Sequence, residues 1–571
     1  MYKAITLFFF AFFLSACMHA QTLMHSEILG RPTDHGMDVH CIFSDTAEVC
    51  IQYGTSTGTY PSQTQWKVFP ADTPAVITVS GLQSDTKYFY RLCYRKPGDA
   101  GMIARAENAF RTKPPAGKAF TFIVQADPHM DSQTDTALYR LCLRNQLLDQ
   151  PDFMVDLGDF LMTDKLKNTS GVITDDTLDY RCNLLRSYYE TSCHSVPLFI
   201  ALGNHEGEAG WYLNGTAGSI AVRNTLARKK YFPNPFPNQF YSGDTSKYNF
   251  VGQRASYYSW TWGDALFVVL DPYWHTTPKP DALNGWRWTL GKAQYEWLRK
   301  TLEKSDAKFK FVFSHQLVGG DPDGRGGVEF ADRYEWGGNN LDSTWGFSAM
   351  RPGWYKPIKD LLTENRVTVF FHGHDHFYGQ QEKDCLIYQE TPQPGHFNFT
   401  SAGQAATYGY LQGVIQPNSG HLRVNVDVNG VKVDYVRAYL PKNENAARHN
   451  RDVSSTYYVK AGNCYDTLSS SVPVLYNRDY SDELVYPNPF MEQTNIRFNV
   501  ASSTIVSIVL SDVSGKTVRH LVNGYPLAPG QFQVSWDGVG DAGTPLPDGI
   551  YAYNIHGNGK MMGSGKIMLK R

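Results

Sequence analysis

Five short motifs that combine Asp, Asn and His occur in one order along the chain. They are Asp127-Pro128-His129, Gly158-Asp159, Gly203-Asn204-His205-Glu206, Ser314-His315 and Gly373-His374-Asp375-His376. Oxygen and imidazole ligands without thiolates suit Mn, Zn or Fe better than an iron–sulfur cluster. Asp159 lies midway in the set and is the natural carboxylate to bridge two ions. The set therefore predicts a dinuclear metal centre in a hydrolase.

Two neighbouring cations would suit the hydrolysis of a phosphate ester. About 4 Å apart, they would lower the pKa of a bound water to around 7 and clamp the phosphoryl oxygens. The neutral amide of Asn204 would leave more net positive charge for the substrate. The expected ligands form two sets around a shared Asp159: Asp127, His129 and His376 for one ion, and Asn204, His315 and His374 for the other.

Three further residues of these motifs have expected roles beside the metal ligands. His205 would protonate the leaving oxygen or stabilise the transition state. Glu206 or Asp375 would accept hydrogen bonds from neighbouring imidazoles and orient them. Any one motif alone would be an ordinary turn or a polar cluster. It is the five in one order, mostly after apolar runs, that indicate a functional site.

The elements expected to position the motifs alternate between strands and helices from residue 118 to residue 440. Helical spacing of apolar residues occurs in 137–148 and 292–302. Open α/β sheets bind their ligands at the carboxyl ends of strands, and the motifs emerge at such ends. Strand-like runs precede the motifs at residues 120–125, 153–157, 198–202, 309–313 and 367–371.

A long Gly-, Asp- and Trp-rich stretch, 319–351, directly follows the His315 motif. Loops of this length in compact domains are usually functional or disordered. We expect a lid or a substrate wall, the alternative being a surface insertion. Arg325, Arg333 and Arg351 within it are candidates to bind a substrate phosphate, or else are solvated loop charges.

Residues 23–115 alternate short β-like runs with turns, which predicts a small β-sandwich. The segment 81–92 resembles the fibronectin type III signature, which implies that Leu82 enters the core and Tyr88 forms a tyrosine corner. Cys50 and Cys93 would fall on neighbouring strands of that fold, on the same outward face. Cys182 and Cys193 are close in sequence and form a second candidate pair. The alternative is that these cysteines are buried free thiols.

The order and spacing of the five motifs resemble the calcineurin-like metallophosphoesterase superfamily over about 120–440. The resemblance implies the ligand assignment given above. The preceding β-sandwich is similar to the arrangement of purple acid phosphatases. Two residues depart from that subfamily: Met162 replaces the Tyr three residues after the bridging Asp, and His129 replaces a small residue. Because the Tyr is absent, no purple charge-transfer colour is expected, and a redox-inert or mixed Mn/Zn/Fe centre is favoured.

The tail, 484–571, resembles the C-terminal sorting domain of type IX secretion substrates. The matching segments are Tyr486-Pro487-Asn488-Pro489-Phe490, Gly549-Ile550-Tyr551 and the basic end Lys570-Arg571. The resemblance implies passage through an outer membrane by the type IX secretion machinery, followed by removal of the tail. Residues 441–483 are expected to be a linker.

The first twenty residues are typical of an export signal. Lys3 precedes a Phe-rich apolar stretch of eleven residues, 4–14, which is too short to span a bilayer. Leu14-Ser15-Ala16-Cys17 resembles a lipobox in which Cys17 would be lipidated. The alternative is cleavage after Ala20, which fits the type IX route better. Either way we expect a secreted or outer-surface protein, and no later run of 18 apolar residues predicts a transmembrane helix.

Composition limits the remaining classes. The net charge is −2 over 571 residues and there is no long basic run, so nothing in the composition indicates nucleic-acid binding. The expected fold is multidomain: an α/β metallophosphatase β-sandwich of four layers, flanked by helices, with all-β sandwich domains at both ends. The expected activity is hydrolysis of phosphomonoesters by a metal-bound hydroxide, with two divalent or trivalent ions of Mn, Zn or Fe. The alternatives are a phosphodiesterase, or a non-catalytic surface adhesion protein with a vestigial core.

Overall fold

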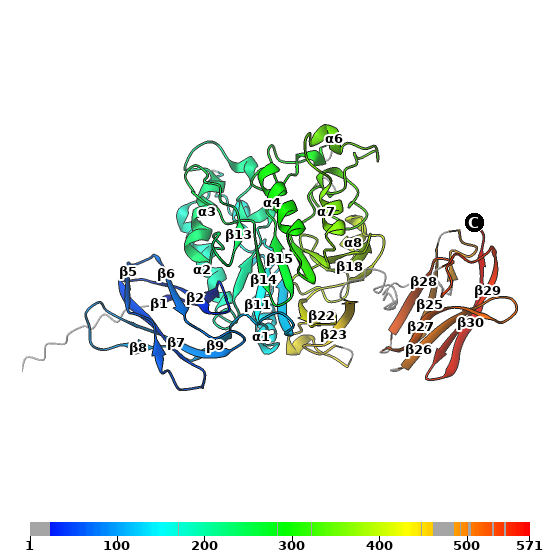
Figure 1. Ribbon diagram of the computed structural model, residues 1–571, viewed down its shortest axis with the longest axis horizontal. Helices are drawn as coiled ribbons and strands as arrows, with labels where there is room; N and C mark the ends of the chain where they lie inside the picture. Colours follow the sequence, from blue (N-terminus) through cyan, green and yellow to red (C-terminus); the bar gives the residue numbers. More distant parts are fainter. Residues whose placement is uncertain are drawn as a thin grey trace, which may run out of the picture.

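The computed structural model describes residues 23–571 except 169–170, 282–283, 321–322, 447, 461–484, 492, 501–503, 528–529 and 542–543. The predicted export signal, with Cys17, lies outside the described residues. β-Rich regions precede and follow a larger core of strands and helices along the chain (Figure 1). Within the described part of the chain, no helix is long and apolar enough to cross a membrane.

Two β-sheets form the centre of the core. The first sheet runs in the order β12-β11-β10-β21-β22-β23, and β10, β11 and β12 are parallel. Its strands are β10 (Phe120–Gln125), β11 (Phe153–Asp156), β12 (Leu198–Ile200), β21 (Gly420–Val426), β22 (Gly430–Arg437) and β23 (Val453–Lys460).

The second sheet runs in the order β13-β14-β15-β16-β17-β19-β18-β20, with β15, β16, β17 and β19 parallel. Its strands are β13 (Ser242–Gly243), β14 (Tyr258–Trp262), β15 (Ala265–Val269), β16 (Phe309–Phe313), β17 (Val369–His372), β18 (Tyr378–Lys383), β19 (Leu386–Glu390) and β20 (Val414–Gln416).

Aromatic side chains join the two sheets face to face. The ring of Phe122 on β10 lies 5.2 Å from the rings of Phe267 on β15 and Phe311 on β16, measured between centroids. These rings belong to one buried cluster that draws residues from both sheets. Such stacks of large rings bury much apolar area and prefer the tilted and edge-on geometry seen here.

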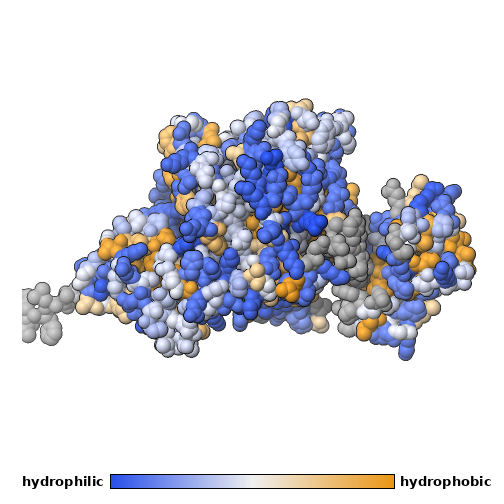
Figure 2. All heavy atoms as spheres, viewed as in Figure 1, coloured by the Kyte–Doolittle hydropathy of each residue, from blue (hydrophilic) through white to orange (hydrophobic). Residues whose placement is uncertain are grey.

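Helices cover the outer faces of both sheets. Ile123 and Met154 of the first sheet pack against Leu185 and Tyr189 of α2 (Asp175–Tyr189). The second sheet packs against α4 (Lys292–Glu303) and α7 (Ile358–Glu364). The outward face of α4 is strongly hydrophilic (Figure 2), as its Lys and Glu content requires. The remaining helices are α1 (Thr136–Leu148), α3 (Ile220–Tyr231), α5 (Tyr334–Gly337), α6 (Phe347–Met350) and α8 (Gln404–Thr407).

The N-terminal region consists of two small sheets around a common core. Leu82 and Tyr88 are buried there, and the Tyr88 hydroxyl accepts a hydrogen bond from the backbone N–H of Gln83 at 2.9 Å. The strands are β1 (Leu23–Gly30), β2 (Gly36–Phe43) and β6 (Pro74–Ser80) in one sheet, and β3 (Ala47–Gly54), β4 (Ser62–Gln63), β5 (Lys67–Phe69), β7 (Lys87–Arg95), β8 (Ile103–Ala104) and β9 (Asn108–Arg111) in the other.

Arg186 fastens this N-terminal region to the core. Its side chain on α2 is fully buried and donates hydrogen bonds to the carbonyl oxygens of Ser26 on β1 and Tyr231 on α3. The backbone N–H of Leu29 also donates to the carbonyl of Cys193 at 2.9 Å. A buried guanidinium needs several acceptors to offset its desolvation, so this contact fixes how the two regions pack.

The first part of the segment 441–483, expected to be a linker, contains a strand of the core. Its residues 453–460 form β23, which pairs with β22 and completes the edge of the first sheet. The alternation of buried and exposed residues along β23 explains why it stays with the core. Residues 461–483 of the segment lie outside the described residues.

The C-terminal region also contains two sheets around its own core, which includes Phe490 and Trp536. Its two ends meet, because the backbone of Phe490 exchanges hydrogen bonds with Met568 and Lys570. The strands are β24 (Val485–Tyr486), β25 (Thr494–Val500) and β28 (Gly530–Trp536), and β26 (Thr504–Ser511), β27 (Thr517–Leu527), β29 (Gly549–Gly557) and β30 (Lys560–Leu569).

Cys50 and Cys93 are expected to form a disulfide when the folded protein is treated with glutathione disulfide. The two residues are directly opposed on β3 and β7, and both are buried thiols. Opposed antiparallel residues hold their Cβ atoms about 4.5–5.5 Å apart, so a small shift allows the bridge. Peptide mapping by mass spectrometry should find the linked peptides, and the free energy of unfolding should rise by about 2–4 kcal/mol.

Cys93→Ser is the matched control, in which neither the linked peptide nor the stabilisation should appear. If both wild-type thiols still react with an alkylating agent after oxidation, the prediction is wrong.

Candidate metal centre

The structure brings the five motifs together at the carboxyl ends of the strands. Asp127 follows β10, Asp159 follows β11, Asn204 follows β12, His315 follows β16 and His374 follows β17. Ligand-capable atoms gather in two groups, each within 4.8 Å: Asp127, His129 and His376 in one, and Asp159, His315 and His374 in the other. The first group is the set predicted for one ion. The second contains His315 and His374 of the other predicted set together with Asp159, and Asn204 follows the neighbouring strand β12.

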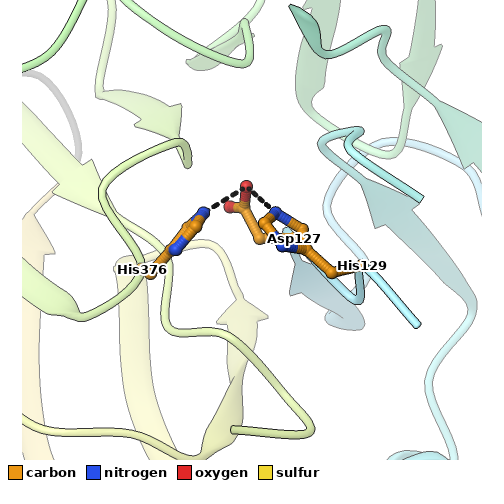
Figure 3. A group of neighbouring side chains, drawn as sticks. All are labelled: Asp127, His129 and His376. Carbon is orange, nitrogen blue, oxygen red and sulfur yellow. Dashed lines mark ion pairs between the residues drawn. The ribbon is translucent and has the colours of Figure 1, made fainter. Parts of the chain in front are cut away.

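The first group is centred on the carboxylate of Asp127, which lies between two imidazoles (Figure 3). Its Oδ1 atom is 3.3 Å from Nε2 of His376 and 3.5 Å from Nε2 of His129. Its Oδ2 atom accepts the backbone N–H of His374 at 2.9 Å. One oxygen of Asp127 is therefore anchored to the chain, and the other faces the imidazoles.

Asp159 is arranged in the same way. Its Oδ1 atom accepts the backbone N–H of His205 at 2.8 Å. Its Oδ2 atom lies 3.2 Å from Nε2 of His315 and 3.8 Å from Nε2 of His129. The same oxygen thus faces one imidazole from each group, as a shared ligand should.

The tautomers of two histidines are set by backbone carbonyls. Nδ1–H of His315 donates to the carbonyl of Leu157 at 2.9 Å, which directs its Nε2 lone pair to the site. Nε2–H of His374 donates to the carbonyl of Asp323 at 3.0 Å, which leaves Nδ1 as its free atom.

Several buried polar atoms of the site have no hydrogen-bond partner among the described residues. They are Oδ1 of Asp127, both ring nitrogens of His129, Oδ1 of Asn204 and Nε2 of His315. Orphaned buried acceptors cost free energy unless something binds them. A carboxylate, an amide oxygen and imidazole nitrogens are the donor set of Mn, Zn and Fe sites, so the residues present fit metal ions.

The charge of the two carboxylates also favours cations here. Burial lowers the pKa of His315, but Asp159 and Asp127 outweigh it and raise that pKa to about 10. Burial likewise opposes protonation of His129, whereas the nearby carboxylates of Asp127 and Asp131 raise its pKa to about 9. A metal ion that binds must displace these protons, so its affinity should fall as the pH falls.

The motif glycines allow the chain to approach the two carboxylates. A Cβ atom at Gly203 would lie 2.2 Å from Oδ1 of Asp159, and one at Gly373 would lie 2.6 Å from Oδ2 of Asp127. At Gly158, where φ is +102°, a Cβ atom would lie 2.3 Å from the backbone N of Gly203. Any side chain at these positions would push a ligand or its backbone out of place.

Left-handed backbone is concentrated at the ligands. The φ angles of Asp127, His129, Asp159, His374 and His376 are all positive, between +48° and +80°. Each such residue costs of order 1–3 kcal/mol and persists only where its surroundings enforce it. This clustering is typical of a functional site.

Glu206 enforces that backbone, which corrects the role expected for it. Its buried carboxylate accepts the N–H groups of Asp159 at 2.9 Å, Phe160 at 2.8 Å, Leu161 at 3.0 Å and also Gly203. Among the described residues it has no imidazole partner. Glu206 therefore shapes the loop that carries Asp159, because the turn after β11 leaves these N–H groups without strand partners.

Asp375 also differs from its expected role. It accepts hydrogen bonds from Arg325 at 3.1 Å, the N–H of Gly326 at 2.9 Å and the Tyr410 hydroxyl at 2.7 Å, all outside the ligand set. Arg325 in turn donates to the carbonyl of His374 at 2.7 Å. Asp375 therefore holds the 319–351 stretch against the site and orients no imidazole among the described residues.

The 319–351 stretch forms part of the site and of the core. The carbonyl of Asp323 and the guanidinium of Arg325 both form hydrogen bonds with His374. Trp336 is fully buried against the helices of the second sheet. Of the arginines considered for phosphate binding, Arg351 is committed elsewhere: its guanidinium pairs with Glu335 and donates to the carbonyls of Trp286 and Trp288.

His205 stands beside the ligands and is oriented by Asp164, which sequence reasoning missed. Nδ1 of His205 lies 2.8 Å from Oδ1 of Asp164, and the Tyr212 hydroxyl donates to Oδ2 of Asp164 at 3.3 Å. Asp164 lies in the short 3₁₀ turn Thr163–Lys165, five residues after Asp159. The only sequence signal was an acidic residue close behind a metal motif.

Comparison with known proteins identifies the core. Residues 120–378 match the calcineurin-like phosphoesterase family, and residues 490–560 match the FlgD Ig-like domain family. The chain contains a calcineurin-like phosphoesterase domain. That family implies divalent metal ions, in agreement with the two ligand groups. No curated protein sequence matches the chain.

Two solved structures have a similar fold over most of the chain. The structure of PhoD is 14% identical, with a TM-score of 0.58, and the match covers 78% of this chain and 92% of that one. The purple acid phosphatase PPD1 from yellow lupin (Lupinus luteus) seeds is 14% identical, with a TM-score of 0.51 and coverage of 80% and 78%. At this identity the likeness concerns the fold alone.

Gly203→Ala is expected to weaken metal binding to the phosphoesterase domain. The added Cβ atom would collide with Oδ1 of Asp159, while φ at 203 needs no glycine. Relief of such a collision costs about 1–3 kcal/mol of stability. Calorimetric melting with and without Mn²⁺ measures the effect: the metal-induced rise in melting temperature should be smaller than in wild type.

Gly101→Ala is the matched control, because a Cβ atom there meets open space. An equal Mn²⁺-induced rise in Gly203→Ala and wild type would show that Asp159 is not a ligand.

Proposed function

We propose that the chain is an exported, dinuclear metal-dependent phosphoesterase that hydrolyses phosphomonoesters. The observation that carries the proposal is the meeting of two ligand groups, with orphaned buried acceptors, inside a calcineurin-like phosphoesterase domain. In a core with only a structural or adhesive role, five buried polar atoms without hydrogen bonds would cost free energy with no compensating function.

Seven residues would hold the ions. Oδ2 of Asp159 would be shared, since it faces His129 of the first group and His315 of the second. The buried amide oxygen of Asn204 would join the second group. When bound, two such cations lower the pKa of a coordinated water and neutralise phosphoryl oxygens. The first ion would take Asp127, His129 and His376, and the second Asn204, His315 and His374.

His205 would deliver a proton to the leaving oxygen. Its Nδ1 atom is held by Asp164, so Nε2 is the atom free to face a substrate. The carboxylate of Asp164 fixes the orientation of the ring, as a group that delivers a proton to a positioned oxygen requires. Tyr212 keeps Asp164 in place through its hydroxyl.

The preference for monoesters is proposed from the similarity in fold to the purple acid phosphatase PPD1, whose match covers 80% of this chain. A diester would present one negative charge fewer to the same cations, so two positive ions suit a monoester dianion better.

We propose export because both ends of the chain carry features of exported proteins. The apolar run 4–14 behind Lys3 supports a signal peptide, and Cys17 would carry a lipid anchor if the lipobox is the cleavage site. The pairing of Phe490 with Met568 and Lys570 joins the signals of the tail in one β-structure. This arrangement supports a tail recognised by the type IX secretion machinery, leaving a secreted or surface-held enzyme.

Asp159→Ala is expected to abolish turnover of 4-nitrophenyl phosphate. Substitution of residues that merely orient metal ligands costs about 10–100-fold in affinity or activity, so loss of the shared ligand should exceed 100-fold. Initial rates with Mn²⁺, Zn²⁺ or Fe²⁺ measure this, beside bis(4-nitrophenyl) phosphate. Preference for the diester would refute the monoester assignment, and turnover of neither ester would refute the enzyme.

Asp164→Asn is expected to slow substrates with poor leaving groups most. A neutral amide would hold the His205 ring less firmly than the carboxylate does, and kcat for phenyl phosphate should fall about tenfold to a hundredfold. 4-Nitrophenolate leaves with little help, so its ester should lose much less. Asp176→Asn, on the exposed first turn of α2, is the control. Equal losses for both esters would contradict a role in proton delivery.

A further inference from the structure

An aromatic wall connects the metal ligands to His205. The Tyr273 ring lies 6.4 Å from the His315 ring and 6.4 Å from that of Trp211, measured between centroids. Trp211 and Tyr212 belong to the turn Gly210–Tyr212, a few residues beyond His205. Tyr212 closes the wall by donating to Asp164, the partner of His205. The wall therefore ends on the side of the site where the proposed proton donor lies.

Two lysines from different loops lie over the outer rings of this wall. Nζ of Lys167, from the loop after β11, is 5.5 Å from the centroid of Tyr212. Nζ of Lys279, from the loop after β15, is 6.0 Å from the centroid of Trp211. Both side chains are exposed. An aromatic face attracts an ammonium group at this range and keeps it near the wall.

Among the described residues, neither lysine ammonium group forms an ion pair with a carboxylate. Two acids of the same loops bind other residues: Asp164 holds His205, and Asp281 pairs with Arg287. The Arg287 guanidinium also donates to the Lys279 carbonyl at 3.3 Å, so the ion pair of Arg287 with Asp281 is bound to the backbone of that loop.

The leaving group must occupy this side of the site. A proton from His205 can reach only a leaving oxygen within hydrogen-bond distance, so the rest of the leaving group extends past His205 toward Tyr212 and Trp211. Two unpaired ammonium groups there would attract an anion and would give a neutral group no comparable gain.

We propose that the natural substrates are phosphomonoesters whose leaving group carries a second negative charge, a phosphate or a carboxylate, bound by Lys167 and Lys279. This inference rests on the proposed function, because it takes His205 as the proton donor. The lysines act as binding residues for the part of the substrate that is not the transferred phosphoryl group.

The test compares phenyl phosphate with 4-carboxyphenyl phosphate, which differ by one carboxylate on the leaving phenol. The metal-loaded full chain should show a higher kcat/KM for the carboxylated ester, by about threefold to tenfold at low ionic strength. The preference should shrink as salt is added, because exposed charges are screened. In the double variant Lys167→Gln/Lys279→Gln, the ratio of the two kcat/KM values should fall to about one.

Lys300→Gln/Lys304→Gln is the matched control, since it removes the same charge from α4 and the residue after it. Its substrate ratio should equal that of wild type. A wild-type ratio of one, or a ratio that the Lys167/Lys279 variant retains, would overturn the proposal. Melting curves of both variants establish that they fold.

Binding of non-hydrolysable analogues separates this inference from the proposed function. Dissociation constants of phenylphosphonate and 4-carboxyphenylphosphonate can be measured by calorimetry whether or not the protein turns over any ester. Absence of turnover with tighter binding of the carboxylated analogue, lost in the Lys167/Lys279 variant, would refute the enzyme but keep the anion site. Equal binding of both analogues, or binding of neither, would overturn the anion site.

Discussion

The structure of the site depends on how Asp127 and Asp159 are held. Each carboxylate has one oxygen fixed by a backbone N–H from a distant motif, that of His374 for Asp127 and that of His205 for Asp159. Each therefore keeps its other oxygen free and aimed at imidazoles. The bond from His374 joins loops that come from opposite sheets, and the bond from His205 joins the loops after the neighbouring strands β11 and β12. Without them the motifs would be separate turns.

This arrangement requires a chain that tolerates crowding and unusual torsion angles. The motif glycines let backbones pass within van der Waals contact of the carboxylates, and the ligand residues themselves adopt left-handed conformations. Glu206 gathers the N–H groups that such turns leave without partners. The aromatic core between the sheets supplies the rigid base on which this strain can persist.

Much of the site could be predicted because its ligands follow strands. Five apolar runs ending in Asp, Asn or His imply that the side chains meet at one edge of the fold, and the two groups were predicted from that logic. The positioning residues could not be predicted in the same way. Asp164 reaches His205 only because a 3₁₀ turn folds back, and Glu206 binds backbone because of torsion angles that no spacing rule reveals. β23 was mistaken for linker because its alternation lies beyond a polar stretch.

We propose that two metal ions share Asp159. Anomalous diffraction from crystals of the Mn²⁺-loaded protein, collected at the manganese edge, would locate the ions. We expect two peaks about 3.5–4 Å apart, one beside Asp127, His129 and His376 and the other beside Asn204, His315 and His374, with Asp159 between them. A single peak, or none near Asp159, would show that Asp159 is not shared by two ions.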